Sequence, residues 1–157
     1  MNILYVTSEA VPFCKTGGLA DVAGSLPQAL AANGDRVSVI LPLYETVKDK
    51  WGDKLHFEQW SYVRLAWRSV YCGLFSYERQ GVTWYFVDNE HYFCRGTLYG
   101  EFDDGERFAF FCKAVIDLLP SLDWMPDILH CNDWQTALVP IYLKRKTSSR
   151  SCPPRSP

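Results

Sequence analysis

The sequence predicts an α/β protein whose mostly parallel sheet carries helices on both faces and a β-hairpin insertion. Short, nearly continuous apolar runs begin at Asn2, Arg36 and Asp127, a pattern typical of strands buried on both faces of a parallel sheet. Segments with apolar residues at three- and four-residue intervals alternate with these runs, as expected of helices with one buried face. With 157 residues, 48% of them hydrophobic, the chain is long enough for one domain with a core.

The first part of the chain predicts a strand, a helix and a second strand. Residues 2–7 form the first expected strand, and Leu19–Asn33 the helix that follows. Pro27 removes a hydrogen bond inside this helix, so we expect a kink or a fresh helix start there. Gly34 tolerates the backbone conformation that ends helices, and residues 36–41 form the second strand. These elements predict a right-handed βαβ unit.

The middle of the chain is rich in aromatic and β-branched residues, which favour strands. Arg79-Gln80-Gly81 has the composition of a hairpin turn. We expect three strands around it, over residues 57–64, 69–78 and 82–87. This block predicts a β-hairpin at the edge of the sheet.

The remainder returns to alternating helices and strands. We expect a loop over His91–Gly105, a helix over Glu106–Leu119 that Pro120 stops, and a strand over residues 127–131. Asp133 is expected to cap a final helix that runs to about Lys146.

The last eleven residues differ from the rest. Residues 147–157 consist mainly of Ser, Pro and Arg, which bury little apolar surface, so we expect them to be disordered. The sequence therefore predicts a lobe over residues 1–146 and a disordered tail over residues 147–157.

Composition argues against several classes of partner. The net charge of −2 gives no basic surface for nucleic acid or an anionic membrane. No apolar run approaches the roughly 20 residues of a membrane span, and Met1 leads directly into a strand, so we expect no signal peptide. The six cysteines form no C-x-x-C pair, which favours reduced thiols in the cytoplasm. No ligand spacing indicates a metal or another cofactor.

The loop after the first strand has the composition of a phosphate site. Lys15 supplies a positive charge, and Gly17 and Gly18 let the backbone approach a ligand and adopt φ values closed to other residues. The helix that follows presents free N–H groups to an anion at its amino end. The local residues equally fit a tight turn with a solvated lysine. Neither common glycine pattern of nucleotide-binding folds is present, which disfavours a dinucleotide-dependent oxidoreductase.

A second group of polar residues follows the strand at residues 127–131. His130, Asp133 and Trp134 lie at its carboxyl end, where ligands bind in open α/β sheets. The carboxylate can bind sugar hydroxyls, and the indole can stack on a sugar ring. Structural roles account for the same residues: a helix cap, a hydrogen-bonded interior histidine and a packed tryptophan. The residues alone favour these structural roles.

Two longer strings add a family resemblance. Residues 8–27 (SEAVPFCKTGGLADVAGSLP) and 130–134 (HCNDW) resemble the opening and the H-x-x-D-W motif of bacterial glycogen synthases and plant starch synthases. These are two-lobed, Rossmann-like glycosyltransferases that use ADP-glucose. The resemblance implies that Asp133 is a catalytic, sugar-binding residue. It also implies that Lys15 contacts the donor, that Gly17 and Gly18 come close to it, and that His130 and Trp134 belong to the substrate site.

Residues 99–111 also resemble this family, in its connection into a middle helix. Their carboxylates are candidates for contacts to glucan, but we expect Asp103 or Asp104 to cap the helix instead.

The resemblance covers residues 1 to about 146 and stops where the tail begins. It implies an incomplete amino-terminal lobe of an enzyme that transfers glucose from ADP-glucose to the nonreducing end of an α-1,4-glucan such as glycogen, with retention. The carboxyl-terminal lobe, which holds most nucleotide contacts in the family, is missing, so the choice between ADP-glucose and UDP-glucose rests on the resemblance. We expect the chain alone to be inactive. The alternative is an inert truncation or a glucan-binding or interaction module.

Overall fold

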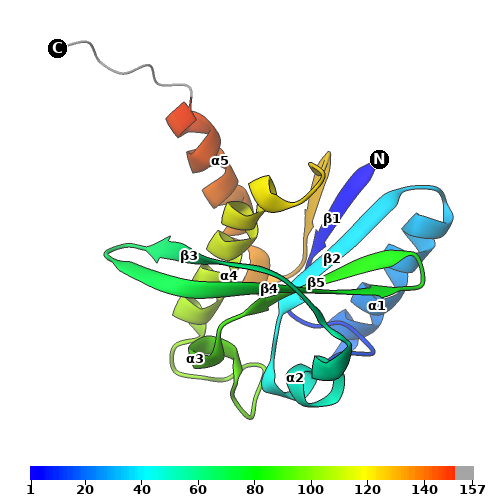
Figure 1. Ribbon diagram of the computed structural model, residues 1–157, viewed down its shortest axis with the longest axis horizontal. Helices are drawn as coiled ribbons and strands as arrows, with labels where there is room; N and C mark the ends of the chain where they lie inside the picture. The colour runs from blue at the N-terminus through cyan, green and yellow to red at the C-terminus, as the bar shows by residue number, and fades with distance from the viewer. Residues whose placement is uncertain (151–157) are drawn as a thin grey trace.

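A six-stranded mixed sheet organises the chain (Figure 1). The computed structural model describes residues 1–150, with side chains for residues 1–148. The strand order is β3-β4-β5-β2-β1-β6, in which β5, β2, β1 and β6 are parallel while β3 and β4 are antiparallel. The strands are β1 (Asn2–Val6), β2 (Arg36–Pro42), β3 (His56–Leu65), β4 (Arg68–Arg79), β5 (Val82–Asp88) and β6 (Ile128–Cys131). The predicted mostly parallel α/β sheet with a hairpin insertion is confirmed.

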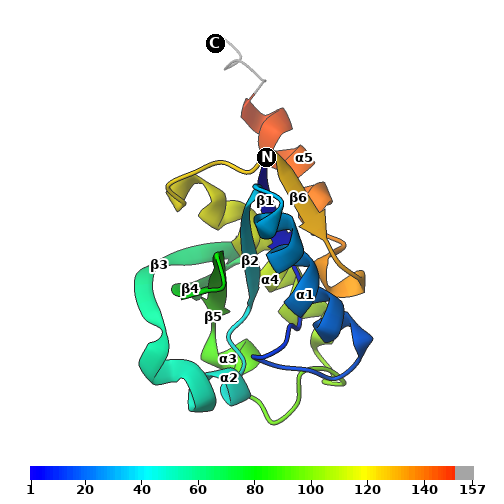
Figure 2. The same cartoon turned by 90° about the vertical axis from the view of Figure 1, so that its right-hand side faces the viewer.

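The helices lie on both faces because the crossovers run in opposite directions along the sheet. β1 leads to β2 on one side, whereas β5 leads to β6 on the other, so right-handed connections place their helices on opposite faces. β6 lies beside β1 in both views (Figures 1 and 2). The helices are α1 (Gly18–Ala32), α2 (Glu45–Trp51), α3 (Glu90–Phe93), α4 (Asp104–Leu118) and α5 (Val139–Arg150), with 3-10 turns η1 (Gly52–Lys54), η2 (Leu119–Ser121) and η3 (Trp134–Thr136).

The α1 helix packs against the rest of the protein through small residues rather than through its large apolar ones. Its buried residues are the small or compact Ala20, Ala23, Gly24 and Pro27, whereas Val22 is half exposed. The helix continues through Pro27, so no fresh start occurs there. It ends at Ala32, and Gly34 follows with a φ of 95° in the left-handed region, as expected.

One of the two hairpin turns in the insertion was predicted, and it is confirmed. Gln80 and Gly81 both have positive φ, at 52° and 75°, which matches the twist of the flanking strands β4 and β5. The β3–β4 hairpin turns at Ala66, which has φ of 50°. β3 forms one edge of the sheet, and β6 forms the other.

Several boundaries differ from the prediction. The expected loop over His91–Gly105 is shorter than predicted, because residues 91–93 belong to α3 and residues 104–105 to α4. Pro120 lies within the 3-10 turn that extends α4. The final helix is divided, because Asp133 precedes the short turn η3 and α5 begins only at Val139.

Part of the predicted tail is helical. α5 continues to Arg150, so residues 147–150 are helical, and the rest of the predicted tail, residues 151–157, lies outside the described residues.

The predicted helix caps were wrong in their contacts. Asp103 occupies the N-cap position of α4, but its side chain makes no capping hydrogen bond and instead pairs with Arg95. Asp104 pairs with the buried Arg107 and accepts the N–H of Gly100. The Arg95–Asp103 ion pair and the Gly100–Asp104 hydrogen bond therefore tie the preceding loop to the start of α4, in place of simple helix capping.

Candidate functional site

The candidate site lies where the direction of the chain along the sheet reverses. β1 and β6 are parallel neighbours, with Tyr5 opposite His130 and Val6 opposite Cys131. The connections leaving β1 and entering β6 lie on opposite faces, and ligands of open α/β sheets bind at the carboxyl ends of such neighbouring strands. The loop carrying Lys15 follows β1, and Asp133 follows β6. The fold therefore brings both predicted segments to one switch point.

Buried aromatic residues anchor the loop after β1. Phe13 packs against the rings of Trp51, Tyr77, Trp84 and Phe86, with centroid separations of 4.9 to 6.1 Å. The N–H of Val11 donates to the carbonyl of Ala20 in α1 at 3.0 Å, and the Val11–Pro12 peptide bond is cis. The loop is thus tied both to the core and to the first turn of the helix.

Glu9 is a buried residue that the sequence interpretation missed. It is only 2% exposed, and Thr16 donates both its N–H (2.5 Å) and its hydroxyl (2.7 Å) to Oε2 of Glu9. The carboxylate therefore sets the path of the backbone that connects Lys15 to Gly17. The sequence offered one signal for this role, since Glu9 is an acidic residue that closely follows a strand expected to be buried. An acidic side chain buried at that place needs hydrogen-bond partners, and the polar residues of the loop can supply them.

The two glycines leave space without special backbone angles. Gly17 has φ of −151° and neither Gly17 nor Gly18 has positive φ, so the expectation of φ values closed to other residues was wrong. A Cβ at Gly18 would meet no atom within 4 Å, and one at Gly17 would meet only Glu9 Oε1 at 4.0 Å. No side chain caps the amino end of α1. Its first N–H groups therefore donate to no side chain, which leaves them available to an anion.

Lys15 is held in place by Asp21 on the first turn of α1. Its Nζ lies 2.7 Å from both carboxylate oxygens, and the two side chains are 49% and 58% exposed. Lys15 is therefore an ion-paired residue of the loop rather than an unpaired surface lysine. Because both groups remain half exposed, an anion at the helix amino end can reach the ammonium.

The segment after β6 is fixed to β1 by hydrogen bonds. The Tyr5 hydroxyl donates to Oδ1 of Asn132 at 3.0 Å, and Nδ2 of Asn132 donates to the carbonyl of Val6 at 2.9 Å. The exposed ring of His130 stacks on Tyr5, with centroids 4.7 Å apart. His130 is therefore an edge residue, and the interior histidine considered as its structural role was wrong.

Asp133 has a strained backbone. Its φ of 61° and ψ of −177° fall in a region that is occupied almost entirely by glycine. Its Oδ1 accepts the N–H of the next residue, Trp134, at 2.7 Å, and Thr136 donates its hydroxyl to the Asp133 carbonyl at 3.2 Å. The exposed carboxylate is thus held in position by a backbone conformation that is unfavourable for a residue other than glycine. Such strain concentrates at functional sites.

Tyr99 joins the two segments and was not predicted as a site residue. Its hydroxyl lies 2.7 Å from that of Ser8, and its ring centroid lies 6.5 Å from that of Trp134. The ring of Phe108 also packs against Trp134, at 5.2 Å, leaving the indole 52% exposed. Burial is the main reason that the pKa of the Tyr99 phenol is raised, so Tyr99 is a neutral hydrogen-bonding group.

Other chemistry at this edge is limited. Burial raises the pKa of the Cys14 thiol to about 12, which argues against a thiolate nucleophile beside Lys15. Within residues 1–150, no three His, Cys, Asp or Glu side chains gather as metal ligands. In the same range, no helix is long and apolar enough to cross a membrane.

Comparisons with known proteins agree with one another. A family model described as the starch synthase catalytic domain matches residues 2–154, which extends beyond the expected boundary near residue 146. A glycogen synthase of Clostridium botulinum (strain Alaska E43) is 54% identical over 144 residues, 92% of this chain and 30% of the relative. A glycogen synthase of Halalkalibacterium halodurans is also 54% identical over 144 residues, with the same coverage. The chain therefore spans about 30% of the length of these relatives.

A solved structure matches the fold as well. It is the catalytic domain of Starch Synthase IV from Arabidopsis thaliana bound to ADP and acarbose, with a TM-score of 0.76 and 30% sequence identity. The match covers 90% of this chain and 31% of that one.

Proposed function

The chain belongs to the family described as the starch synthase catalytic domain, and we propose that it forms one wall of a sugar-nucleotide cleft in a longer enzyme. That enzyme transfers glucose from ADP-glucose to the nonreducing end of an α-1,4-glucan, with retention. Residues 1–146 contribute to its amino-terminal lobe. The support is that the Lys15 loop and the Asp133 segment meet at the switch point between β1 and β6.

The roles of the loop residues follow from charge and space. Lys15 and the uncapped amino end of α1 provide positive charge for the donor diphosphate, and Gly17 and Gly18 keep side chains out of its path. Positive charge fixed beside the diphosphate stabilises the leaving nucleotide as its bond to glucose breaks. Asp21 orients the ammonium before the donor binds.

The segment after β6 contributes to the sugar side of the cleft. The exposed carboxylate of Asp133 accepts sugar hydroxyls and stabilises positive charge developing on the glucosyl ring. Trp134 offers half of its indole as an apolar surface, and His130 lies on β6 with its ring stacked on Tyr5. The bond between Tyr5 and Asn132 holds this segment in place. These are the substrate-binding roles that the resemblance implies.

The chain alone is proposed to have no transferase activity. It spans about 30% of its relatives, and one wall of a cleft cannot position donor and acceptor together. A role as a glucan-binding module is the second candidate, supported by the exposed Trp134 beside Asp133. We place the parent enzyme in the cytoplasm, with ADP-glucose and glycogen as its partners.

A chimeric enzyme tests the proposal directly. Residues 1–144 would replace the matching segment of the Clostridium botulinum glycogen synthase, and ADP release from ADP-glucose would be measured with and without glycogen. We expect glycogen-dependent ADP release. Lys15→Ala should lower donor use by tenfold or more, since it removes charge beside the diphosphate, and Asp133→Asn should reduce turnover.

Lys50→Ala is the matched control, because it removes the same charge from α2. Unchanged donor use in Lys15→Ala would refute the role of Lys15. A chimera that folds cooperatively yet releases no ADP would refute the assignment of this chain to a working lobe. Turnover by the isolated chain would contradict the claim that one wall is insufficient.

A further inference from the structure

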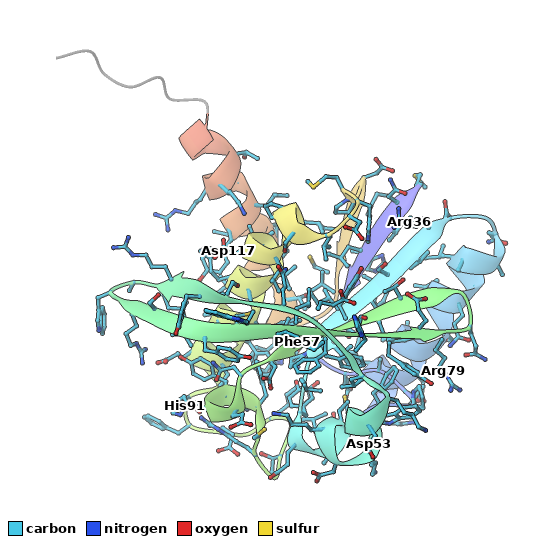
Figure 3. All side chains as sticks on the ribbon, viewed as in Figure 1. Arg36, Asp53, Phe57, Arg79, His91 and Asp117 are labelled. Carbon is cyan, nitrogen blue, oxygen red and sulfur yellow. The ribbon has the colours of Figure 1, made fainter. Side chains whose placement is uncertain are left out.

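A separate cavity of about 530 Å³ lies between the tip of the β3–β4 hairpin, α4 and α5. Its charged and aromatic lining comprises Arg64 from β3, Lys113 and Asp117 from α4, and Tyr142, Arg145 and Lys146 from α5. Figure 3 labels Asp117 on α4 beside α5. Three elements distant in sequence therefore converge on one cavity, and none of its lining residues belongs to the candidate cleft.

The cavity lining is strongly positive although the chain is weakly acidic. Four cationic side chains face one carboxylate, which gives a net charge of +3 (four minus one), against −2 for the whole sequence. Asp117 is already shared, since its oxygens lie 2.5 Å from Lys113 Nζ and 3.8 Å from Lys146 Nζ. Lys146 also donates to the carbonyl of Ile116. One carboxylate therefore neutralises only part of the positive charge.

The two arginines carry the uncompensated charge. Among the side chains of residues 1–148, no carboxylate forms an ion pair with Arg64 or Arg145. Arg145 and Tyr142 line the same cavity, and the positive charge of Arg145 opposes the rise that burial causes in the pKa of the Tyr142 phenol. Guanidinium groups bind phosphate through two parallel hydrogen bonds, which an ammonium cannot do. A phosphate group is the natural counterion for such a pair.

The rest of the lining is apolar. Leu65, Ala66 and Ile116 contribute apolar surface to the wall, and Tyr142 adds an aromatic ring. A cavity of this size falls within the range of small-molecule sites, roughly 300–1,000 Å³. Because the charge surrounds a single cavity instead of following a groove, a nucleic acid backbone does not fit the arrangement.

We propose that this cavity binds a phosphorylated small molecule, with Arg64 and Arg145 contacting the phosphate and the apolar wall contacting the organic part. The site is distinct from the cleft at β1 and β6, and it does not depend on the proposed transferase function. A ligand in this cavity would contact both the β3–β4 hairpin and α5, and would therefore link these two elements.

Binding to the intact chain tests the proposal, with inorganic pyrophosphate and glucose 1-phosphate as probes. Titration calorimetry at constant ionic strength should give saturable binding of both. The double variant Arg64→Ala/Arg145→Ala should weaken each by at least tenfold. Circular dichroism melting would check that the variant folds, as expected for two exposed side chains.

Two controls separate binding in this cavity from binding elsewhere on the chain. Lys50→Ala/Lys54→Ala removes the same charge from α2 and η1, and it should leave binding within twofold of the unaltered chain. Binding that persists in the arginine variant and is lost in Lys15→Ala would come from the glycine loop, where the proposed function places a diphosphate. Equal losses in the control and arginine variants, absence of saturable binding, or loss in Lys15→Ala alone would overturn the proposal. Binding of pyrophosphate without glucose 1-phosphate would contradict the role of the apolar wall.

Discussion

Gly24 of α1 lies in close contact with the loop that carries Lys15. A Cβ added there would lie 2.3 Å from Cγ2 of Val11 and 2.7 Å from its carbonyl oxygen, much closer than van der Waals contact. The loop cannot withdraw easily, because the N–H of Val11 donates to Ala20 and Phe13 is buried among aromatic rings. Gly24→Ala therefore forces the helix and the loop apart.

The expected magnitude is the difference between two opposing effects. Replacing an interior helical glycine with alanine stabilises a helix by about 1 kcal/mol when space is free. Overpacking a close contact costs about 1–3 kcal/mol, and a clash with a backbone carbonyl belongs at the upper end of that range. We expect Gly24→Ala to lower the free energy of unfolding by about 1–2 kcal/mol, which corresponds to a Tm lower by roughly 2–8 °C.

Urea unfolding followed by circular dichroism measures this change. Gly105→Ala is the matched control, because Gly105 lies in the first turn of α4 and its added Cβ would meet nothing within 4 Å. It should leave stability unchanged or raise it by up to about 1 kcal/mol. If Gly24→Ala were as stabilising as Gly105→Ala, the close packing of the loop against α1 would be refuted.

Three further outcomes are expected. Hydrogen bonds from Arg95 lower the pKa of Asp103 from its ordinary value of 3.8. The stability that they contribute is present above that pH and is lost as the pH falls through the pKa of the folded protein. In Arg95→Met, the free energy of unfolding in urea should therefore depend less on pH between about pH 5 and 3. Burial raises the pKa of Cys14 and Cys72 to about 12, so peptide mapping after iodoacetamide at pH 8 should find both unmodified, and rapid labelling would contradict their burial. Asp133→Gly should be more stable than Asp133→Ala by about 1–3 kcal/mol in urea, and equal stabilities would refute backbone strain at that residue.

Most strands were predictable because their signals are local. The apolar runs of β1, β2 and β6 and the alternation in β3 to β5 are properties of neighbouring residues, and the turn at Gln80-Gly81 needs only their tolerance of positive φ. Helix boundaries were less accurate. The contacts that displaced them, such as Arg95 with Asp103, join residues on opposite sides of a loop and leave no periodic pattern.

The candidate site was predictable in its residue types but not in its contacts. Lys15 and Asp133 stood out because a cation beside two glycines and a carboxylate after a strand have recognised chemistry. The pairing of Lys15 with Asp21, the burial of Glu9 and the bridging position of Tyr99 were not predicted. Each depends on side chains that approach one another only after the loop has folded onto α1.

The sequence by itself determined the alternation of strands and helices, the hairpin insertion and the family, because these follow from hydrophobic periodicity and from continuous motifs. Only the tertiary structure decided that β6 adds beside β1, about 125 residues away in the chain. That pairing brings Lys15 and Asp133 to one switch point, and the packing of the hairpin, α4 and α5 gathers the cations of three elements around a second cavity. Strand order and cavity lining are non-local, since they depend on which buried surfaces fit together rather than on any single segment.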